Sequence, residues 1–146
     1  MTEDAGMLLR EAARGGVYRV SDNHDAVRAA AGSWLARVRL AEVAGKESLL
    51  STLAESLGFP AWFGGNWDAL EDCLCDLSWR SAKGHVLLFE DYAQLRESHP
   101  DEFGVLLDVL DAAADYWRGR GIPFFALFVD PESALALPQL FERNAR

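Results

Sequence analysis

Six acidic side chains lie between residues 47 and 79, and no lysine, arginine or histidine accompanies them. Asp68, Asp72 and Asp76 are spaced four residues apart, so a helix would place their carboxylates in one row. Glu71 would widen that row. Like charges at this spacing destabilise a helix by roughly 0.2–0.5 kcal/mol per pair. The plain interpretation is a solvated helix face, and the alternative is a surface that binds a basic partner or a metal ion.

An aromatic turn comes directly before this row of acids. Trp62 and Phe63 are followed by Gly64, Gly65 and Asn66, so bulky rings and a flexible backbone adjoin the carboxylates. Aromatic residues beside charged ones are typical of the residues that anchor protein interfaces. The alternative is that the rings pack in the core or brace the start of the helix. Both interpretations stay open on the residues alone.

The helix that would carry the acids has a capping residue and an apolar face. Asn66 is placed to cap its first turn. The apolar residues follow the i, i+3, i+4, i+7 pattern of a buried helix face, and they are Leu70, Cys73, Leu74 and Leu77. We therefore expect the carboxylates on the opposite, exposed side.

The surrounding elements predict an α/β domain. Residues 34–40 alternate apolar and polar side chains in their second half, as in a strand with one wetter face. Residues 85–90 and 122–129 are nearly continuous apolar runs, as in strands covered on both faces. Helical spacing predicts helices over residues 46–57 and 100–118. Strands separated by helices favour a small parallel sheet with right-handed crossovers.

The two ends of the chain carry weaker patterns. A short helix is indicated near Met7 and Leu8, a short strand at residues 17–20, and an alanine-rich helix after Ser21. We treat residues 1–33 as an N-terminal extension, residues 34–130 as the main domain and residues 131–146 as a peripheral C-terminal extension. Pairing with a sheet edge, dimer formation and binding of another partner are all open roles for these extensions.

The composition is that of one acidic globular domain. Half of the 146 residues are hydrophobic, and 23 acids against 14 bases give a net charge of -9. This charge disfavours binding to nucleic-acid phosphates and favours a basic protein partner. The acidic N-terminus and the lack of an apolar run of about 20 residues predict a cytoplasmic protein that does not bind a membrane.

Enzymatic chemistry has little support in the sequence. The row of acids could hold Mg²⁺ in principle, but no nucleophile and base accompany it. His24, His85 and His99 lie outside the acidic segment and are interpreted as structural or surface residues. Cys73 and Cys75 would point about 200° apart on a helix, which predicts reduced thiols rather than a disulfide. We expect no catalytic residue, no metal and no cofactor.

The segment FPAWFGGNWDALEDCL, residues 59–74, resembles the signature of the barstar family, the intracellular inhibitors of barnase-type ribonucleases. The aromatic pair, the glycine after it, the Asn-x-Asp-Ala-Leu run and the Asp-Cys-Leu run all match. The resemblance covers residues 34–130. It implies a barstar-like fold, a three-stranded parallel sheet packed with helices. It also implies that the protein partner is a basic secreted ribonuclease or nuclease toxin, and we expect the chain to act as a monomer.

The resemblance also implies roles for individual residues. Asp68 and Asp72 resemble the two inhibitory aspartates, which engage the cationic side chains of the ribonuclease active site in place of RNA phosphates. Asp72 is expected to be the deeper of the two. Trp62 and Phe63 match the aromatic pair, whose first ring contacts the enzyme, and Gly64 matches the loop glycine.

Other residues of the segment are secondary candidates for partner binding, namely Asn66, Glu71 and Asp76. The chain departs from the family at Glu71, where an aromatic can stand, and at Gly65, where an acid can stand. A further acidic contact of the family, made by a later helix, is matched only approximately by Asp115 or Tyr116.

The main rival interpretation keeps the fold and changes the partner. A barstar-like domain could serve as a protein–protein interaction module whose target is not a ribonuclease, because a fold does not fix a function. A neighbouring gene for a secreted basic nuclease would favour inhibition over this alternative.

Overall fold

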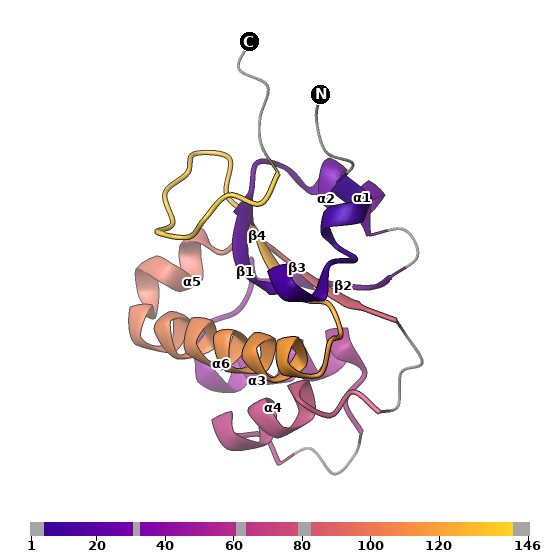
Figure 1. Ribbon diagram of the computed structural model, residues 1–146. Helices are drawn as coiled ribbons and strands as arrows, with labels where there is room; N and C mark the ends of the chain where they lie inside the picture. Colours follow the sequence, from indigo (N-terminus) through magenta and orange to yellow (C-terminus); the bar gives the residue numbers. More distant parts are fainter. Residues whose placement is uncertain (1–4, 31–32, 61–63, 79–82, 142–146) are drawn as a thin grey trace.

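Four parallel strands form one sheet at the centre of the molecule. The computed structural model describes residues 5–30, 33–60, 64–78 and 83–141 (Figure 1). The strands are β1 (Gly16–Val20), β2 (Trp34–Arg39), β3 (His85–Glu90) and β4 (Phe124–Val129). Their order across the sheet is β1-β4-β3-β2, and every neighbouring pair is parallel.

The expectation of three strands is therefore wrong by one. The additional strand is β1, in which residues 16–20 pair with residues 125–129 of β4. It comes from the N-terminal extension, which the family resemblance does not cover. A five-residue strand gives only a faint sequence pattern, and its pairing with a segment more than 100 residues away leaves no local trace.

Most of the predicted helices are confirmed. α3 spans Lys46–Leu57 and ends at Gly58, whose φ of 66° lies in the left-handed region that glycine favours. α6 spans Pro100–Gly119. α2 spans Asn23–Ala29, and Asp22 caps it by accepting a hydrogen bond from the Asp25 backbone N–H. Three short helices complete this set: α1 (Ala5–Leu8), the 3₁₀ helix η1 (Ala12–Arg14) and α5 (Ala93–Ser98).

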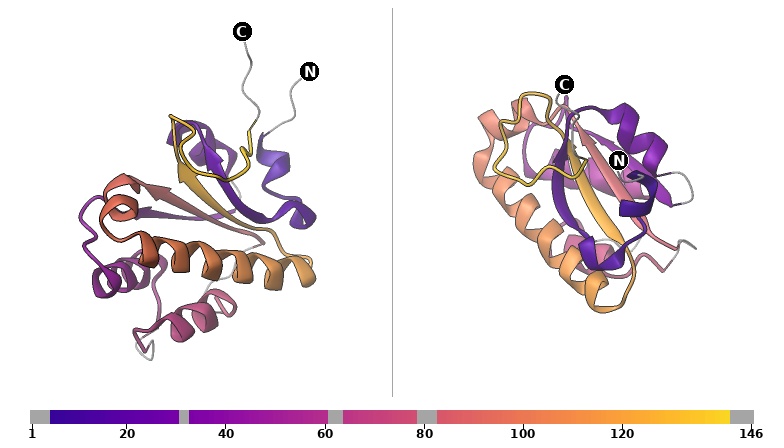
Figure 2. Two further views of the ribbon diagram at one scale, coloured as in Figure 1. Left: turned by 90° about the vertical axis from the view of Figure 1, so that its left-hand side faces the viewer. Right: turned by 45° about the horizontal axis from the view of Figure 1, so that its top comes forward.

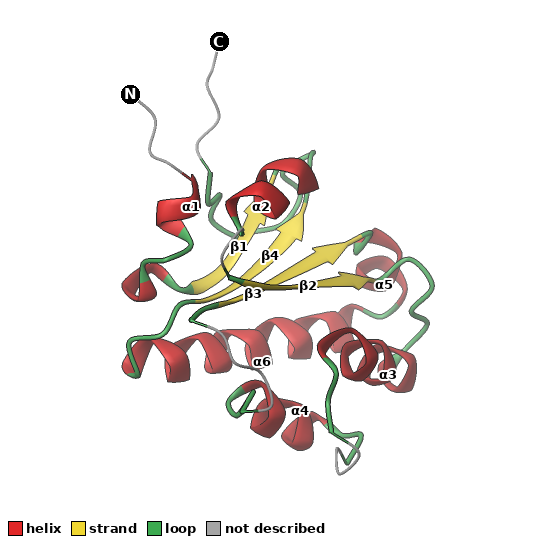
Figure 3. Cartoon of the chain, turned by 90° about the vertical axis from the view of Figure 1, so that its right-hand side faces the viewer, coloured by secondary structure: helices red, strands yellow, loops and turns green. Residues whose placement is uncertain are grey.

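The sheet separates two layers of helices. α3, α4 (Trp67–Leu74), α5 and α6 lie on one side, and α1 and α2 lie on the other (Figures 2 and 3). Side chains alternate between the two cores along each strand, as the pleat requires. Leu87 and Phe89 of β3 face the large helical layer, whereas Val86 and Leu88 face the layer of α2.

α4 lies on the outside of its layer. It packs mainly against α6, and Figure 3 shows it farther from the strands than α6. The helix that carries the predicted site is thus placed on top of another helix.

The segment after β4 is more than peripheral as far as the structure describes it. Asp130 is buried and accepts hydrogen bonds from the backbone N–H groups of Ala134 and Leu135 and from the Tyr92 hydroxyl. Farther along, Gln139 forms a parallel bridge with Arg19 of β1. The segment therefore folds back along the outer edge of β1.

Candidate functional site

Asn66 fixes where the acidic helix begins. The backbone N–H of Ala69 donates to its Oδ1 at 2.7 Å, so the predicted cap is confirmed. Gly64 and Gly65 precede it and are exposed. Gly65 has a φ of 74°, which explains a glycine at that position. Trp62 and Phe63 lie outside the described residues.

One face of α4 is apolar and the other is acidic. Leu70, Cys73 and Leu74 are fully buried. Asp68, Glu71 and Asp72 are exposed. The N-terminal position of Asp68 is stabilised by the helix dipole, whereas Asp72 lies beyond the reach of this effect.

No described cationic side chain neutralises these carboxylates. Across residues 5–30, 33–60, 64–78 and 83–141, Asp68, Glu71 and Asp72 have no ion-pair partner among the lysines, arginines and histidines. An external cationic group would therefore meet three fully available carboxylates.

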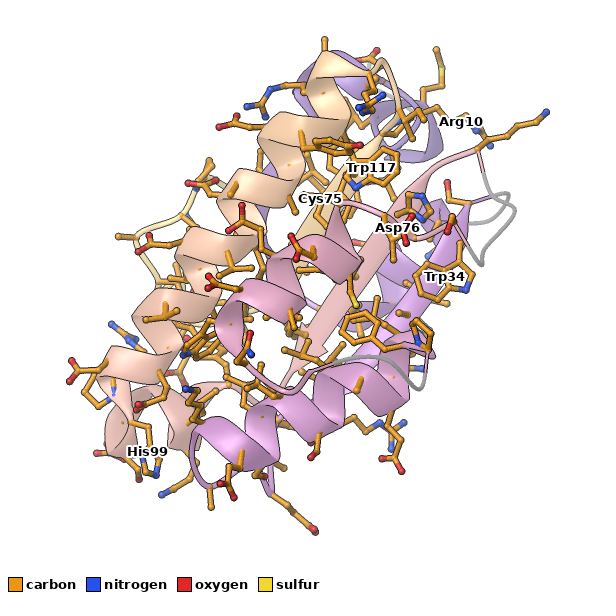
Figure 4. The ribbon with its side chains drawn as sticks, turned by 90° about the horizontal axis from the view of Figure 1, so that it is seen from below. Arg10, Trp34, Cys75, Asp76, His99 and Trp117 are labelled. Atoms are coloured by element: carbon orange, nitrogen blue, oxygen red, sulfur yellow. The ribbon has the colours of Figure 1, made fainter. Side chains whose placement is uncertain are left out.

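Asp76 does not continue the row on the same helix. α4 ends at Leu74, and the backbone N–H groups of Asp76 and Leu77 both donate to the Cys73 carbonyl oxygen. Leu77 has a φ of 48°, in the left-handed region, so the chain turns away after Cys75. The prediction of three aspartates along one helix is wrong for this third residue, although Asp76 is exposed beside the end of α4 (Figure 4).

Trp117 holds the end of α4 in place. Its indole Nε1–H donates to the Leu74 carbonyl oxygen at 2.8 Å, and the bond is buried. Figure 4 shows Trp117, Cys75 and Asp76 together at this end of the helix. The ring of Trp117 also lies 5.3 Å from that of His85, which is buried on β3. The four-residue spacing in α6 predicted a buried Trp117, but nothing in the sequence indicated its bond to α4.

The neighbouring residues of α6 differ from Trp117 in exposure. Tyr116 is 37% exposed, and the Arg120 guanidinium lies 4.5 Å from the centre of its ring. Asp115 forms an ion pair with Arg118. Of the two candidates on this helix, Asp115 is thus partly neutralised and Tyr116 presents an aromatic surface.

Both cysteines are free thiols, and the surroundings of each raise its pKa. Burial, as the largest cause, and the nearby carboxylates of Glu71 and Asp72 together raise the pKa of Cys75 to about 11. Burial raises the pKa of the Cys73 thiol too, with Asp76 and Asp72 adding to the effect. Thiols in this environment are protonated at neutral pH, so they are poor nucleophiles and poor metal ligands.

The described ranges contain neither a cluster of metal-binding side chains nor a membrane-spanning helix. No group of three or more His, Cys, Asp or Glu side chains in these ranges is arranged to hold a metal ion. No helix in them is both long enough and apolar enough to cross a membrane.

Comparison with known proteins identifies the family. A search of the curated proteins finds no match to the chain. The family model described as Barstar (barnase inhibitor) matches residues 34–129, which include β2, β3, β4 and the whole of α4. This match covers well over half of the sequence, and the chain belongs to the barstar family.

Proposed function

We propose that this protein inhibits a basic ribonuclease, or a related nuclease toxin, by placing the carboxylates of α4 in its active site. The observation that carries the proposal is the pair Asp68 and Asp72, exposed one helical turn apart on a family-matched helix and free of any ion pair within the described chain. A ribonuclease active site must hold a phosphate with cationic side chains. Two fixed carboxylates can occupy that site and offer no bond to cleave.

The electrostatics support rapid and salt-sensitive binding. Residues 47–146 carry 17 of the 23 acids but only 7 of the 14 bases. An acidic surface attracts a basic partner over several ångströms before contact, and dissolved salt screens this attraction. We therefore expect the association rate to fall as ionic strength rises.

The position of α4 supports a rigid rather than an adaptable surface. The helix is capped by Asn66 at one end and tied through Leu74 to Trp117 at the other. Carboxylates on a helix with both ends held lose little freedom when a partner binds. We place this encounter in the cytoplasm, with a single copy of the chain bound to the nuclease before its secretion. Trp62, Phe63 and Gly64 complete the proposed surface.

The test is inhibition of RNA cleavage by a barnase-type ribonuclease. Wild-type protein is titrated against the Asp68→Asn/Asp72→Asn variant, which keeps side-chain size and removes two charges. Glu97→Gln/Glu132→Gln is the matched control, because both residues are exposed and lie outside α4, on α5 and after β4.

We expect stoichiometric inhibition by the wild type and the control, and its loss in the α4 variant. The circular-dichroism spectrum should be the same for all three proteins. Inhibition that survives in the α4 variant contradicts the assignment of these carboxylates. No inhibition by any folded form moves the function to a partner that is not a ribonuclease.

A further inference from the structure

The two outer edges of the sheet, β1 and β2, differ in whether another segment of the chain forms hydrogen bonds with them. Along β1, the Arg19 backbone N–H donates to the Pro138 carbonyl at 2.9 Å, and the Leu140 N–H donates to the Arg19 carbonyl at 3.1 Å. The Arg19 side chain adds bonds to Leu137 and Gln139. This edge is therefore covered by the chain's own C-terminal segment.

Along the edge of β2, the described part of the chain provides no such cover. In a parallel ladder, residues alternate between those bonded to the neighbouring strand and those directed away from it. The N–H groups of Trp34 and Leu40 donate inward, to Gly84 and Glu90, which fixes this alternation. The N–H and C=O groups of Leu35, Arg37 and Arg39 are thus directed outward. No segment among the described residues bonds to them, and Figure 3 shows β2 as the outermost strand.

The usual means of protecting a free edge are largely missing from β2. It contains no proline, and its register with β3 runs unbroken from Trp34 opposite His85 to Arg39 opposite Glu90, without a bulge. It is as long as β3. Monomeric proteins normally interrupt, shorten, charge or cover such an edge, because it can pair with another chain.

Of these protective features, β2 has charged side chains, Arg37 and Arg39. Arg37 is held in a close ion pair with Glu90. Arg37 Nη2 lies 2.7 Å from Glu90 Oε2, and Asn23 Nδ2 donates to the same oxygen at 2.8 Å. Burial would raise the pKa of Glu90, but these bonds outweigh it and hold the pKa below its usual value, so the carboxylate stays charged. Arg39 lies 3.8 Å from Glu90, and its side chain is 73% exposed. Its guanidinium can therefore bind an arriving group.

We propose that the edge of β2 is a second protein-binding site, which accepts an extended segment of another protein with an apolar residue opposite Leu35 and an acid opposite Arg39. The strand supplies backbone hydrogen bonds, and alternate side chains on one face give the selectivity. Leu35 is half-buried and offers an apolar contact at one end of the edge. The residues of this site are separate from those of α4.

A second copy of the chain is a poorer occupant. Antiparallel pairing about a two-fold axis at Arg37 would place the Arg37 residues of the two copies opposite one another, and each copy carries a net charge of -9. A segment from a different protein places no arginine opposite Arg37, and its acid meets the exposed guanidinium of Arg39.

The test measures hydrogen exchange of individual amides by NMR. The probe is the peptide Thr-Val-Thr-Thr-Thr-Glu-Thr, with both ends blocked, together with the same sequence reversed to allow either strand direction. A matched pair of peptides has lysine in place of glutamate. At about 90% occupancy, the outward amides of residues 35, 37 and 39 should exchange about tenfold more slowly, because only the free fraction exchanges.

Charge reversal gives the control. Arg39→Glu should transfer protection from the glutamate peptides to the lysine peptides, and Asp68→Asn/Asp72→Asn should leave peptide binding unchanged. The latter variant separates this site from the proposed inhibitory surface. The proposal is overturned if no peptide protects the three amides or if both charges protect them equally. Protection that rises with protein concentration alone also overturns it, because the occupant is then a second copy.

Discussion

The bond between Trp117 and Leu74 predicts a large loss of stability in Trp117→Phe. Leu74 is the last residue of α4, so its carbonyl has no partner within the helix and depends on the indole N–H. Leaving a buried carbonyl without its donor costs about 1–3 kcal/mol. The smaller ring adds about 1 kcal/mol for the space left in the core. We expect a total loss of about 2–4 kcal/mol.

Urea unfolding measures this loss. With a slope of about 2 kcal/mol per molar, a loss of 3 kcal/mol lowers the unfolding midpoint by about 1.5 M. Tyr116→Phe is the matched control, because it changes one aromatic ring at an exposed neighbouring position and should stay within about 0.5 kcal/mol of the wild type. If Trp117→Phe unfolds at the wild-type midpoint, the indole hydrogen bond does not hold α4 in place.

Three further predictions concern the cap, the thiols and the C-terminal segment. Asn66→Ala should cost about 1 kcal/mol in urea unfolding, because the Ala69 N–H loses its acceptor; an unchanged midpoint contradicts the capping role. Cys75, with a pKa of about 11, should be alkylated by iodoacetamide about a hundredfold more slowly at pH 8 than a free thiol, and the rate should rise towards pH 11. Mass spectrometry of the modified protein measures this rate. Alkylation at pH 8 as fast as that of free cysteine would contradict the buried, acidic surroundings of this thiol. Burial would raise the pKa of Asp130, but hydrogen bonds from Leu135, Ala134 and Tyr92 outweigh it and lower the pKa from its usual 3.8. The ionised carboxylate therefore stabilises the fold fully above the unfolded-state pKa, and this stabilisation is lost as the pH falls through the folded-state pKa. Unfolding midpoints between pH 6 and pH 2.5 should therefore fall less steeply in Asp130→Asn than in the wild type, and parallel curves would count against this role.

The strongly periodic parts of the fold were predictable from the sequence. α3 and β3 have the predicted limits, and α6 extends only one residue beyond its expected end. These segments combine a continuous apolar pattern with clear stop signals, such as Gly58 after α3. β4 begins at Phe124, just after Pro123, because a proline cannot donate to the ladder.

The parts that were not predictable depend on distant contacts. The sequence indicated a short strand at residues 17–20, which β1 confirms, but not which strand it pairs with, since its partner β4 lies more than 100 residues away. α5 is a six-residue helix with one buried side chain, Leu95. The segment after β4 has no periodic pattern of its own, since polar bonds at Asp130 and Gln139 hold it. Short elements give little local signal, so tertiary packing decides them.

In the candidate site too, local features were predictable from the sequence and features that depend on distant contacts were not. The spacing of Asp68 and Asp72 and the cap at Asn66 are local features, and the structure has them as expected. The position of Asp76 depends on the left-handed turn at Leu77, a leucine whose residue type favours a continued helix. The role of Trp117 depends on which helix α6 meets.

Because α4 lies on the outside of its layer, selection for folding acts on its inner face and selection for binding acts on its outer face. Its inner residues are constrained by their packing against α6, whereas Asp68, Glu71 and Asp72 are exposed and contribute nothing to the core. Substitutions at the outer positions can therefore accumulate without loss of folding, and a duplicated gene could acquire a new target by changing a handful of codons. In such a lineage we expect the inner face of α4 and Trp117 to evolve slowly while the outer face diverges.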